Sequence, residues 1–224
     1  YSYFLVKTDG IFQTQQEIDA HVNSRGIKIQ PNAVPGDIKF IDHNDDGKIN
    51  DEDRQYLGSY LPKITYSFGG NLNYKGFDLS VMFQGVGDVY VYNGFKQMGL
   101  TGRNAGNNML SQVLDSWNYN KNSGLPRLSI AGDANDNFGT VSDFLLEDAS
   151  YLRLKNITVG YTLPKSAMNS LGLDNSSIRL YLSGENIATF TSYSGIDPEV
   201  GNFGLDSGNY PVPRTFSVGV NFNF

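Results

Sequence analysis

The last ten residues of the chain, TFSVGVNFNF, constrain its fold more than any other segment. From Thr215 to Phe224 apolar side chains occupy every second position, and small or polar ones lie between them. A β-strand has a side-chain period of two, so the segment predicts a strand with one apolar face and one polar face. With 39% hydrophobic residues in the chain, one such window carries little weight alone, and recurrence decides the matter.

The same alternation recurs along the chain. Strands are expected at 63–74 and 77–92, and the two residues Lys75 and Gly76 between them indicate a hairpin turn. Further strands are expected at 150–163, 177–190 and 213–224, and one more at 1–8. Within 150–163 the apolar phase shifts between Leu154 and Ile157, which indicates either a β-bulge or the place where the strand leaves the bilayer region. The sequence therefore predicts an all-β fold with about six strands.

Short and long connections alternate between these strands. The links at 75–76 and 164–176 are short, whereas 9–62, 93–149 and 191–212 are long. Outer-membrane β-barrels show this pattern, with tight periplasmic turns and long extracellular loops. About six strands are too few to close a wide barrel, and an open sheet would leave unpaired edges in lipid. We therefore expect the C-terminal strands of a large antiparallel transmembrane β-barrel.

Composition excludes several other classes of protein. The net charge is −6 and no basic stripe occurs, so no nucleic-acid partner is expected. The chain has no cysteine and only two histidines, His21 and His43, which leaves little for imidazole catalysis. Glu185, Asp197 and Glu199 lack the paired arrangement that a glycosidase needs. No catalytic residue is assigned, and we expect that the chain is not an enzyme.

The stretch FIDHNDDGKINDEDR, residues 40–54, has the spacing of a calcium-binding loop. Calcium takes six to eight oxygen ligands, which alternate side chains on a tight loop around a glycine can supply. The expected ligands of a structural Ca²⁺ are Asp42, Asn44, Asp46, Lys48 through its carbonyl, Asn50 and Asp53. The last position is Asp rather than Glu, which shortens its reach. The alternative is a solvated acidic turn, since Asp, Asn and Gly also dominate turns.

Three groups of residues, most of them aromatic, have competing interpretations. Met109, Val113 and Trp117 have the spacing of an amphipathic helix within a long loop, which either packs on the neighbouring loops or contacts a partner or substrate. Trp117, Tyr119 and Arg127 have side chains that stack on sugars, although loop aromatics more often anchor loops. Aromatics near strand ends read as the interfacial girdles of a barrel, or as ordinary core in a soluble fold; they are Tyr66, Tyr74, Phe77, Tyr90, Tyr92 and Tyr161.

Four blocks of the sequence, in this order, resemble the SusC/RagA group of TonB-dependent outer-membrane transporters. They are PGDIKFIDHNDDGKINDEDRQYLGSYLPKITYSFGGNLNYKGFDLSVMFQG, LEDASYLRLKNITVGYTLP, IRLYLSGENIATFTSYSGIDPEV and YPVPRTFSVGVNFNF. The resemblance implies that residues 1–224 are the C-terminal part of a multi-pass barrel in the outer membrane of a Gram-negative bacterium. A plug domain and a TonB-contacting segment of such a transporter are absent from these residues.

The resemblance also implies a function and partners. The function is import of oligosaccharides or peptides, driven by the TonB complex through the missing N-terminal part. The implied partners are a SusD-like surface lipoprotein that acts as a lid, the surrounding membrane lipid, and the barrel-assembly machinery, which would recognise the terminal phenylalanine.

A rival interpretation is a soluble, calcium-stabilised β-sandwich that binds carbohydrate. The two differ in what the apolar side chains of the last strand contact. Phe216, Val218, Val220 and Phe222 face outward in a barrel, whereas in a sandwich they pack against a second sheet.

Overall fold

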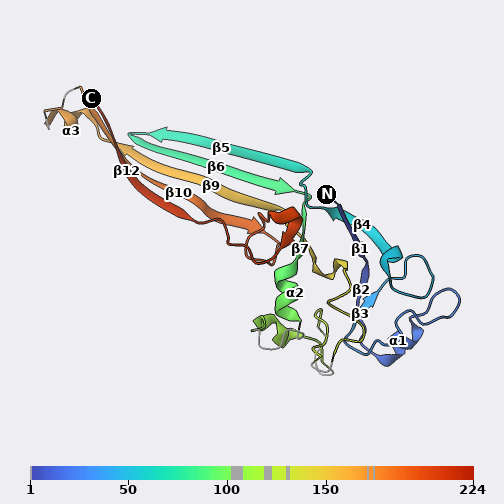
Figure 1. The fold of residues 1–224 in the computed structure, drawn as a ribbon. Helices are drawn as coiled ribbons and strands as arrows, with labels where there is room; N and C mark the ends of the chain where they lie inside the picture. The colour runs from blue at the N-terminus through green and yellow to red at the C-terminus, as the bar shows by residue number, and fades with distance from the viewer. Residues whose placement is uncertain (1, 102–107, 119–122, 130–131, 171, 174) are drawn as a thin grey trace. The chain divides into compact units, whose positions relative to one another are not determined.

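The computed structural model describes two compact units (Figure 1). The described residues are 2–101, 108–118, 123–129, 132–170, 172–173 and 175–224. Each unit is assembled from three separate stretches of the chain. Unit 1 contains Tyr1–Leu61, Tyr90–Glu147 and Val200–Asn209, and unit 2 contains Pro62–Val89, Asp148–Glu199 and Tyr210–Phe224.

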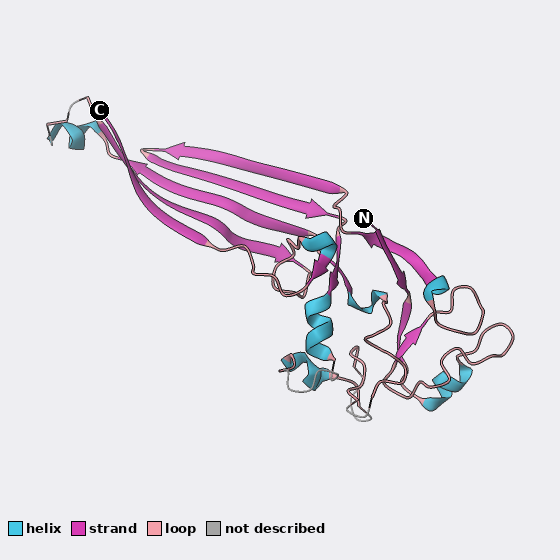
Figure 2. Ribbon diagram, in the orientation of Figure 1, coloured by secondary structure: helices cyan, strands magenta, loops and turns pink. Residues whose placement is uncertain are grey.

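Unit 2 is built on one five-stranded antiparallel sheet (Figure 2). The strand order is β12-β10-β9-β6-β5, so each strand pairs with the sheet strand that precedes or follows it in the chain. The short helix α3 (Lys165–Ser170) lies in the link between β9 and β10. The strands are β5 (Ile64–Tyr74), β6 (Phe77–Gly87), β9 (Tyr151–Thr162), β10 (Ser177–Thr191) and β12 (Thr215–Asn223). Alternation predicted all five, but the strand expected at 77–92 is too long: β6 ends at Gly87, and Tyr90–Asn93 forms a separate strand, β7, in another sheet.

The turn between β5 and β6 confirms the predicted hairpin. Lys75 has φ 47° and Gly76 has φ 88°, so both central residues are in the left-handed region that a tight hairpin turn requires. A side chain on Gly76 would place its Cβ 2.9 Å from the carbonyl oxygen of Thr162, which leaves room only for glycine. Tyr74 and Phe77 then pair directly across the hairpin.

The predicted bulge is also present in β9. Along β6, Met82 pairs with Asn156 while the next residue, Phe83, pairs with Leu154, so Lys155 is the extra residue. A bulge shifts the phase of the strand by one residue, and this shift keeps apolar side chains on one face along the whole of β9.

The connections of the sheet are segregated by length. In an antiparallel meander alternate connections lie at opposite ends, so the β5–β6 turn and the β9–β10 link share one end. The long connections from β6 to β9 and from β10 to β12 leave the other end. Phe224 closes the chain at the end that carries α3 (Figure 1).

Unit 1 contains short elements arranged in three small sheets. Its sheets pair β1 with β4, β2 with β3, and β11, β7 and β8 with one another. The strands are β1 (Ser2–Val6), β2 (Thr8–Ile11), β3 (Ile38–Phe40), β4 (Arg54–Ser59), β7 (Tyr90–Asn93), β8 (Leu146–Asp148) and β11 (Leu205–Asp206). The helices are α1 (Gln15–Ala20), α2 (Gly94–Leu100) and the 3₁₀ turns Asp51–Asp53, Ser111–Asp115, Asp143–Leu145 and Asn202–Gly204.

The strand expected at 1–8 exists, but its predicted place among the strands of the large sheet is wrong. It forms β1, which pairs with β4 in unit 1. The reason is burial: Leu5 and Val6 are 4% and 3% exposed and belong to two apolar clusters of unit 1. Alternation of apolar and polar residues predicts that a segment is a strand, but it does not predict which strand it pairs with.

The described residues of unit 1 include three apolar clusters, which form its core. One contains Leu5, Tyr92, Leu100, Phe138 and Leu145, the second Val6, Ile38 and Phe40, and the third Phe12, Ile18 and Ala33. The side chain of Thr14 caps α1 by accepting a hydrogen bond from the Glu17 N–H, which directs Ile18 into the third cluster.

The helix expected around Met109, Val113 and Trp117 is shorter than predicted. Only Ser111–Asp115 is helical, as a 3₁₀ turn. Val113 packs against the first cluster, and Trp117 is 7% exposed. The structure of this segment is therefore set by packing within unit 1, and the spacing of apolar residues does not give a longer helix. No helix among the described residues is long and apolar enough to cross a membrane.

Candidate functional site

One face of the unit 2 sheet is apolar across all five strands. In an antiparallel sheet, residues that pair directly lie on the same face. One row joins Val218, Leu182, Val159, Leu79 and Leu72, and the next joins Val220, Leu180, Tyr161, Phe77 and Tyr74. The register thus gathers the apolar half of every alternating segment into one continuous surface.

This apolar surface is exposed. On β12 the exposed fractions are 75% for Phe216, 81% for Val218, 63% for Val220 and 47% for Phe222. Within the described residues no second sheet covers them. The two-sheet sandwich is therefore not the fold of this unit. A sheet that exposes such a surface requires an apolar environment around it, which is the property of a lipid-facing wall.

The opposite face of the sheet is polar and carries an ion pair across three strands. The Arg179 Nε and Nη2 atoms donate to both carboxylate oxygens of Asp78, at 2.8 and 2.5 Å. The strand between them contributes Gly160, whose missing side chain leaves the space that the two charged groups fill. Arg179 also lies 5.1 Å from the ring centre of Tyr181, which itself covers Gly219. Glycines here allow long polar side chains to lie flat along the face.

Part of the predicted aromatic girdle gathers at the end of the sheet with the short turns. Tyr74 pairs with Phe77, and the ring centres of Phe77 and Tyr161 are 4.5 Å apart. Tyr66 lies farther along β5 and is 40% exposed. The prediction is wrong for Tyr92, which is 9% exposed in the core of unit 1. Tyr90 also lies outside the sheet, in β7.

The acidic loop at 40–54 is closed by its own hydrogen bonds. Asp53 is fully buried and accepts from the backbone N–H groups of His43 and Asn50 at 2.8 Å, and from that of Asn44 at 3.4 Å. With Asn50 it forms a capping box at the 3₁₀ turn Asp51–Asp53. The short side chain of Asp53 therefore closes the loop through the backbone.

Asp42 and Asp46, two of the remaining candidate ligands, accept hydrogen bonds from backbone N–H groups within the loop. Asp42 accepts from the N–H groups of Asp46 and Gly47, and Asp46 accepts from that of Lys48. Gly47 has φ 87°, as the sharp turn requires. Among the described residues no three His, Cys, Asp or Glu side chains are grouped so as to hold a metal ion. The turn is thus present, and Ca²⁺ binding stays a prediction.

Arg127 and Trp117 are anchors of their loops. Arg127 donates to the buried carboxylate of Asp37 at 2.7 Å, and the indole N–H of Trp117 donates to Gln13 at 2.7 Å. Both side chains are thus held by contacts within unit 1. Tyr119, the third residue that was considered for sugar stacking, lies outside the described residues.

Arg153 is a residue that sequence reasoning missed. It is 2% exposed, and it donates to Asp197 at 2.6 Å, to Glu199 at 2.8 Å and to Thr189 at 2.9 Å. Burial acts to raise the pKa of Asp197, but the N–H groups of Glu199 and Val212 and the Arg153 guanidinium outweigh it and lower that pKa. Asp197 and Glu199, two of the three carboxylates considered for a glycosidase, thus hold the long connection onto β9 and β10. In the sequence Arg153 is flanked by Leu152 and Leu154, but nothing there identifies its partners.

Comparison with known proteins agrees with this geometry. No family model matches the chain. TonB-dependent receptor P3 of Formosa agariphila is 34% identical over 203 residues, which are 85% of this chain and 19% of that protein. TonB-dependent receptor P26 of the same organism is 34% identical over 235 residues, 98% of this chain and 22% of its own length. TonB-dependent receptor SusC of Bacteroides thetaiotaomicron is 27% identical over 86% of this chain and 18% of SusC. The chain belongs to the TonB-dependent receptors.

A solved structure shows the same fold. The structure of the RagAB peptide importer in its closed-closed state superposes with a TM-score of 0.71 at 24% identity, over 98% of this chain and 22% of that one. TonB-dependent receptors are outer-membrane β-barrels, and the five-stranded sheet is part of such a barrel wall. These relatives are named as receptors and a peptide importer and not as enzymes, in agreement with the expectation for this chain. The chain spans about a fifth of the length of the curated relatives that it matches.

Proposed function

We propose that the chain supplies wall strands and extracellular loops to a TonB-dependent importer of oligosaccharides or peptides in the outer membrane. The observation that carries the proposal is the reversed polarity of the unit 2 sheet, with its apolar face exposed and its charged groups on the other face. Lipid then contacts the apolar face, and the polar face lines the interior of the barrel. Unit 1 is formed largely by the long connections that leave one end of the sheet, and these are the extracellular segments of the proposal.

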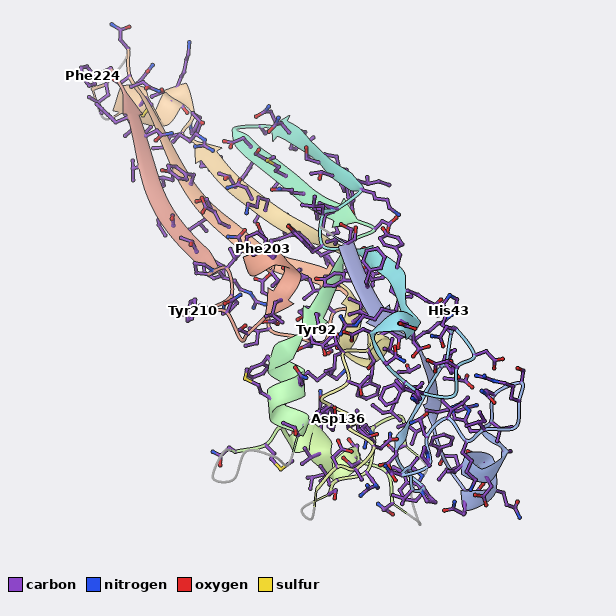
Figure 3. The ribbon with its side chains drawn as sticks, turned by 45° about the vertical axis from the view of Figure 1, so that its right-hand side comes forward. His43, Tyr92, Asp136, Phe203, Tyr210 and Phe224 are labelled. Atoms are coloured by element: carbon purple, nitrogen blue, oxygen red, sulfur yellow. The ribbon has the colours of Figure 1, made fainter. Side chains whose placement is uncertain are left out.

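The partners follow from the same assignment. Because the family includes SusC, we propose a SusD-like surface lipoprotein over the extracellular loops and energy supply through TonB. The RagAB structures are described as a peptide importer, which supports a peptide as one of the two substrate classes. The proposed partners also include the barrel-assembly machinery, with Phe224, which follows β12 and is 97% exposed (Figure 3), as the residue that it recognises.

Quenching by brominated lipid tests which face of the sheet contacts the membrane. The intact receptor, with its native tryptophans replaced by phenylalanine, is reconstituted with one tryptophan introduced at either of two neighbouring positions. Leu182→Trp faces the apolar side and is expected to be quenched strongly. The control Ser183→Trp faces the polar side and is expected to be quenched little. Equal quenching at both positions would contradict the proposal. Uptake of labelled oligosaccharides and peptides by cells with and without the receptor identifies the substrate class.

We also propose a structural Ca²⁺ in the acidic loop, with ligands from Asp42, Asn44, Asp46, Lys48, Asn50 and Asp53. Its support is the turn geometry together with the chemistry of these ligands, since a carboxylate oxygen that accepts one N–H keeps a second lone pair. Calorimetric titration of the intact receptor with Ca²⁺ tests it. The Asp46→Ala variant is expected to remove the binding signal, and Glu52→Ala, outside the predicted ligand set, serves as the control. Absence of a signal in millimolar Ca²⁺ would reject the site.

A further inference from the structure

The end of the unit 2 sheet that carries the short turns exposes aromatic side chains on its apolar face. Tyr74 is 65% exposed and Phe77 is 57% exposed, and they pair directly across the β5–β6 hairpin. Tyr161 of β9 joins them, with its ring against that of Phe77 and beside the turn at Gly76. Aromatic side chains gather where a barrel wall meets the headgroups of the lipids. This group therefore marks the headgroup level of the membrane at one end of the sheet.

Lys75, in the turn itself, holds its charge on the same side of the sheet. Its ammonium nitrogen Nζ lies over the Tyr74 ring, 5.2 Å from the ring centre. A cation over an aromatic face is attracted by the negative charge of that face. Because Tyr74 belongs to the apolar face, this contact places the positive charge on the lipid-facing side of the wall and not in the interior of the barrel.

No acidic side chain among the described residues pairs with the Lys75 ammonium. The next acid along the chain, Asp78, lies on the polar face and is paired with Arg179. The lysine at the other end of β5 differs, since Lys63 is paired with Asp88 at 2.6 Å. Within the part of the chain that the structure describes, the sheet thus has a neutralised lysine where the long connections leave it and an uncompensated one at the short turn.

The backbone of the turn makes lysine an unfavourable residue at position 75. Its φ of 47° is in the left-handed region, which a residue with a side chain adopts at a cost in free energy. Asparagine is favoured at this position of the turn, because it reaches the left-handed conformation more easily. Lys75 thus brings a positive charge together with backbone strain, and strained residues cluster at functional sites.

We propose that Lys75, Tyr74 and Tyr161 form a binding site for the headgroup of an anionic phospholipid. The phosphate of the lipid contacts the Lys75 ammonium, the two tyrosine hydroxyls are further donors in the group, and the acyl chains lie along the apolar face of β5 and β6. A lipid with a net negative charge is favoured over a zwitterionic one, whose own cationic group competes with the lysine. The site rests on the proposed function, in which this end of the sheet lies in the periplasmic leaflet.

Quenching by brominated lipid, read at one introduced tryptophan, tests the proposal locally. The intact receptor, with its native tryptophans replaced by phenylalanine, is reconstituted in phosphatidylcholine vesicles that contain a minor fraction of brominated phosphatidylglycerol. The reporter is Phe77→Trp, beside Lys75. Phe222→Trp is the matched reporter, because Phe222 lies on the same apolar face at the same end of the sheet, three strands away. The association constant of the anionic lipid is expected to be about 5-fold higher at Phe77→Trp, the effect of one lysine near an anionic headgroup.

Three further substitutions assign the effect to the charge of one lysine. Lys75→Asn suits the left-handed turn and removes the charge, so it is expected to lower the association constant at Phe77→Trp to the value at Phe222→Trp. Lys75→Arg keeps the charge and should keep the preference for the anionic lipid. Lys63→Gln removes a lysine that already has a carboxylate partner, and it should leave the preference unchanged.

The following outcomes would overturn the proposal. One is equal association of the anionic lipid at the two reporters. Another is a preference that persists in Lys75→Asn, or that disappears in Lys75→Arg or Lys63→Gln. A third is loss of the preference when inorganic phosphate replaces chloride at constant ionic strength, which would assign the lysine to a free anion.

Brominated phosphatidylcholine separates this site from the proposed function. Strong quenching of both reporters by this zwitterionic lipid would show that both lie in a lipid-facing wall, and a missing preference for phosphatidylglycerol would then reject only the headgroup site. Weak quenching of both reporters would contradict the wall itself and, with it, the site.

Discussion

The two units differ in whether their apolar side chains are buried or exposed. In unit 1 they are enclosed, with Phe12 and Ile38 fully buried. In unit 2 the same kinds of side chain cover the outside of a sheet, and Val218 is 81% exposed. A β-strand in either unit shows similar hydrophobicity in sequence. The difference shows that unit 1 can be stabilised by its own packing, whereas the sheet of unit 2 depends on what surrounds it.

The largest effect on stability is expected from creating a cavity in the core of unit 1. Phe12→Ala removes a fully buried ring that packs in the cluster with Ile18 and Ala33, which costs about 3–5 kcal/mol. Native-state hydrogen exchange of the intact receptor measures this as lower protection in unit 1. Phe216→Ala is the matched control, because its ring is 75% exposed and its loss leaves protection in unit 1 unchanged. Equal losses of protection would contradict the contrast between the units.

The next effect comes from placing a charge on the apolar face of unit 2. Val218→Arg is expected to cost about 2–4 kcal/mol in folding free energy, as charged residues do near the middle of a bilayer. Ser217→Arg, one residue away and on the polar face, is expected to cost far less. Denaturant titration of the receptor refolded into lipid vesicles measures both. A similar cost for the two variants would contradict the assignment of the apolar face to lipid and of the polar face to the barrel interior.

A smaller effect is expected in the acidic loop of unit 1. Asp53→Ala leaves the N–H groups of His43, Asn44 and Asn50 without their acceptor, at a cost of about 1–3 kcal/mol. Faster hydrogen exchange at these three amides is the expected result. Glu52→Ala, an exposed neighbour, should leave their exchange unchanged. Unaltered exchange in Asp53→Ala would show that another contact closes the loop.

The smallest effect is a pH dependence of the connection held by Arg153. The pKa of Asp197 is lowered in the folded protein, so its stabilising contribution is present above the unfolded pKa of about 3.9 and is lost as pH falls through the folded pKa. Cleavage within 192–214 by an acid-stable protease is therefore expected to accelerate in that range. Asp197→Asn should give a flat profile. A profile unchanged by this substitution would assign the effect to another group.

Much of the fold could be predicted from local pattern. Alternation identified β5, β6, β9, β10 and β12, and the phase shift in β9 located its bulge. Glycine and turn chemistry predicted the hairpin at Lys75 and Gly76. These features depend on the side-chain period and on backbone sterics, which are properties of a few neighbouring residues.

Contacts between distant segments could not be predicted in this way. The partner of β1 depends on which apolar cluster encloses Leu5 and Val6. Tyr92 looked like an interfacial aromatic because its neighbours in sequence resemble a strand end, and only packing shows that it belongs to a core. Arg153 gave no signal of its role, because its partners Asp197 and Glu199 lie more than forty residues away in the chain.

The sequence by itself determined that the chain forms amphipathic strands with tight turns at one end and long connections at the other. It also determined the turn chemistry of the acidic loop. Only the tertiary structure decided which of two similar apolar patterns is enclosed and which is exposed. The physical reason is that a period of two specifies that a strand has two different faces, while the medium on each face is set by elements far away in the chain or by the membrane.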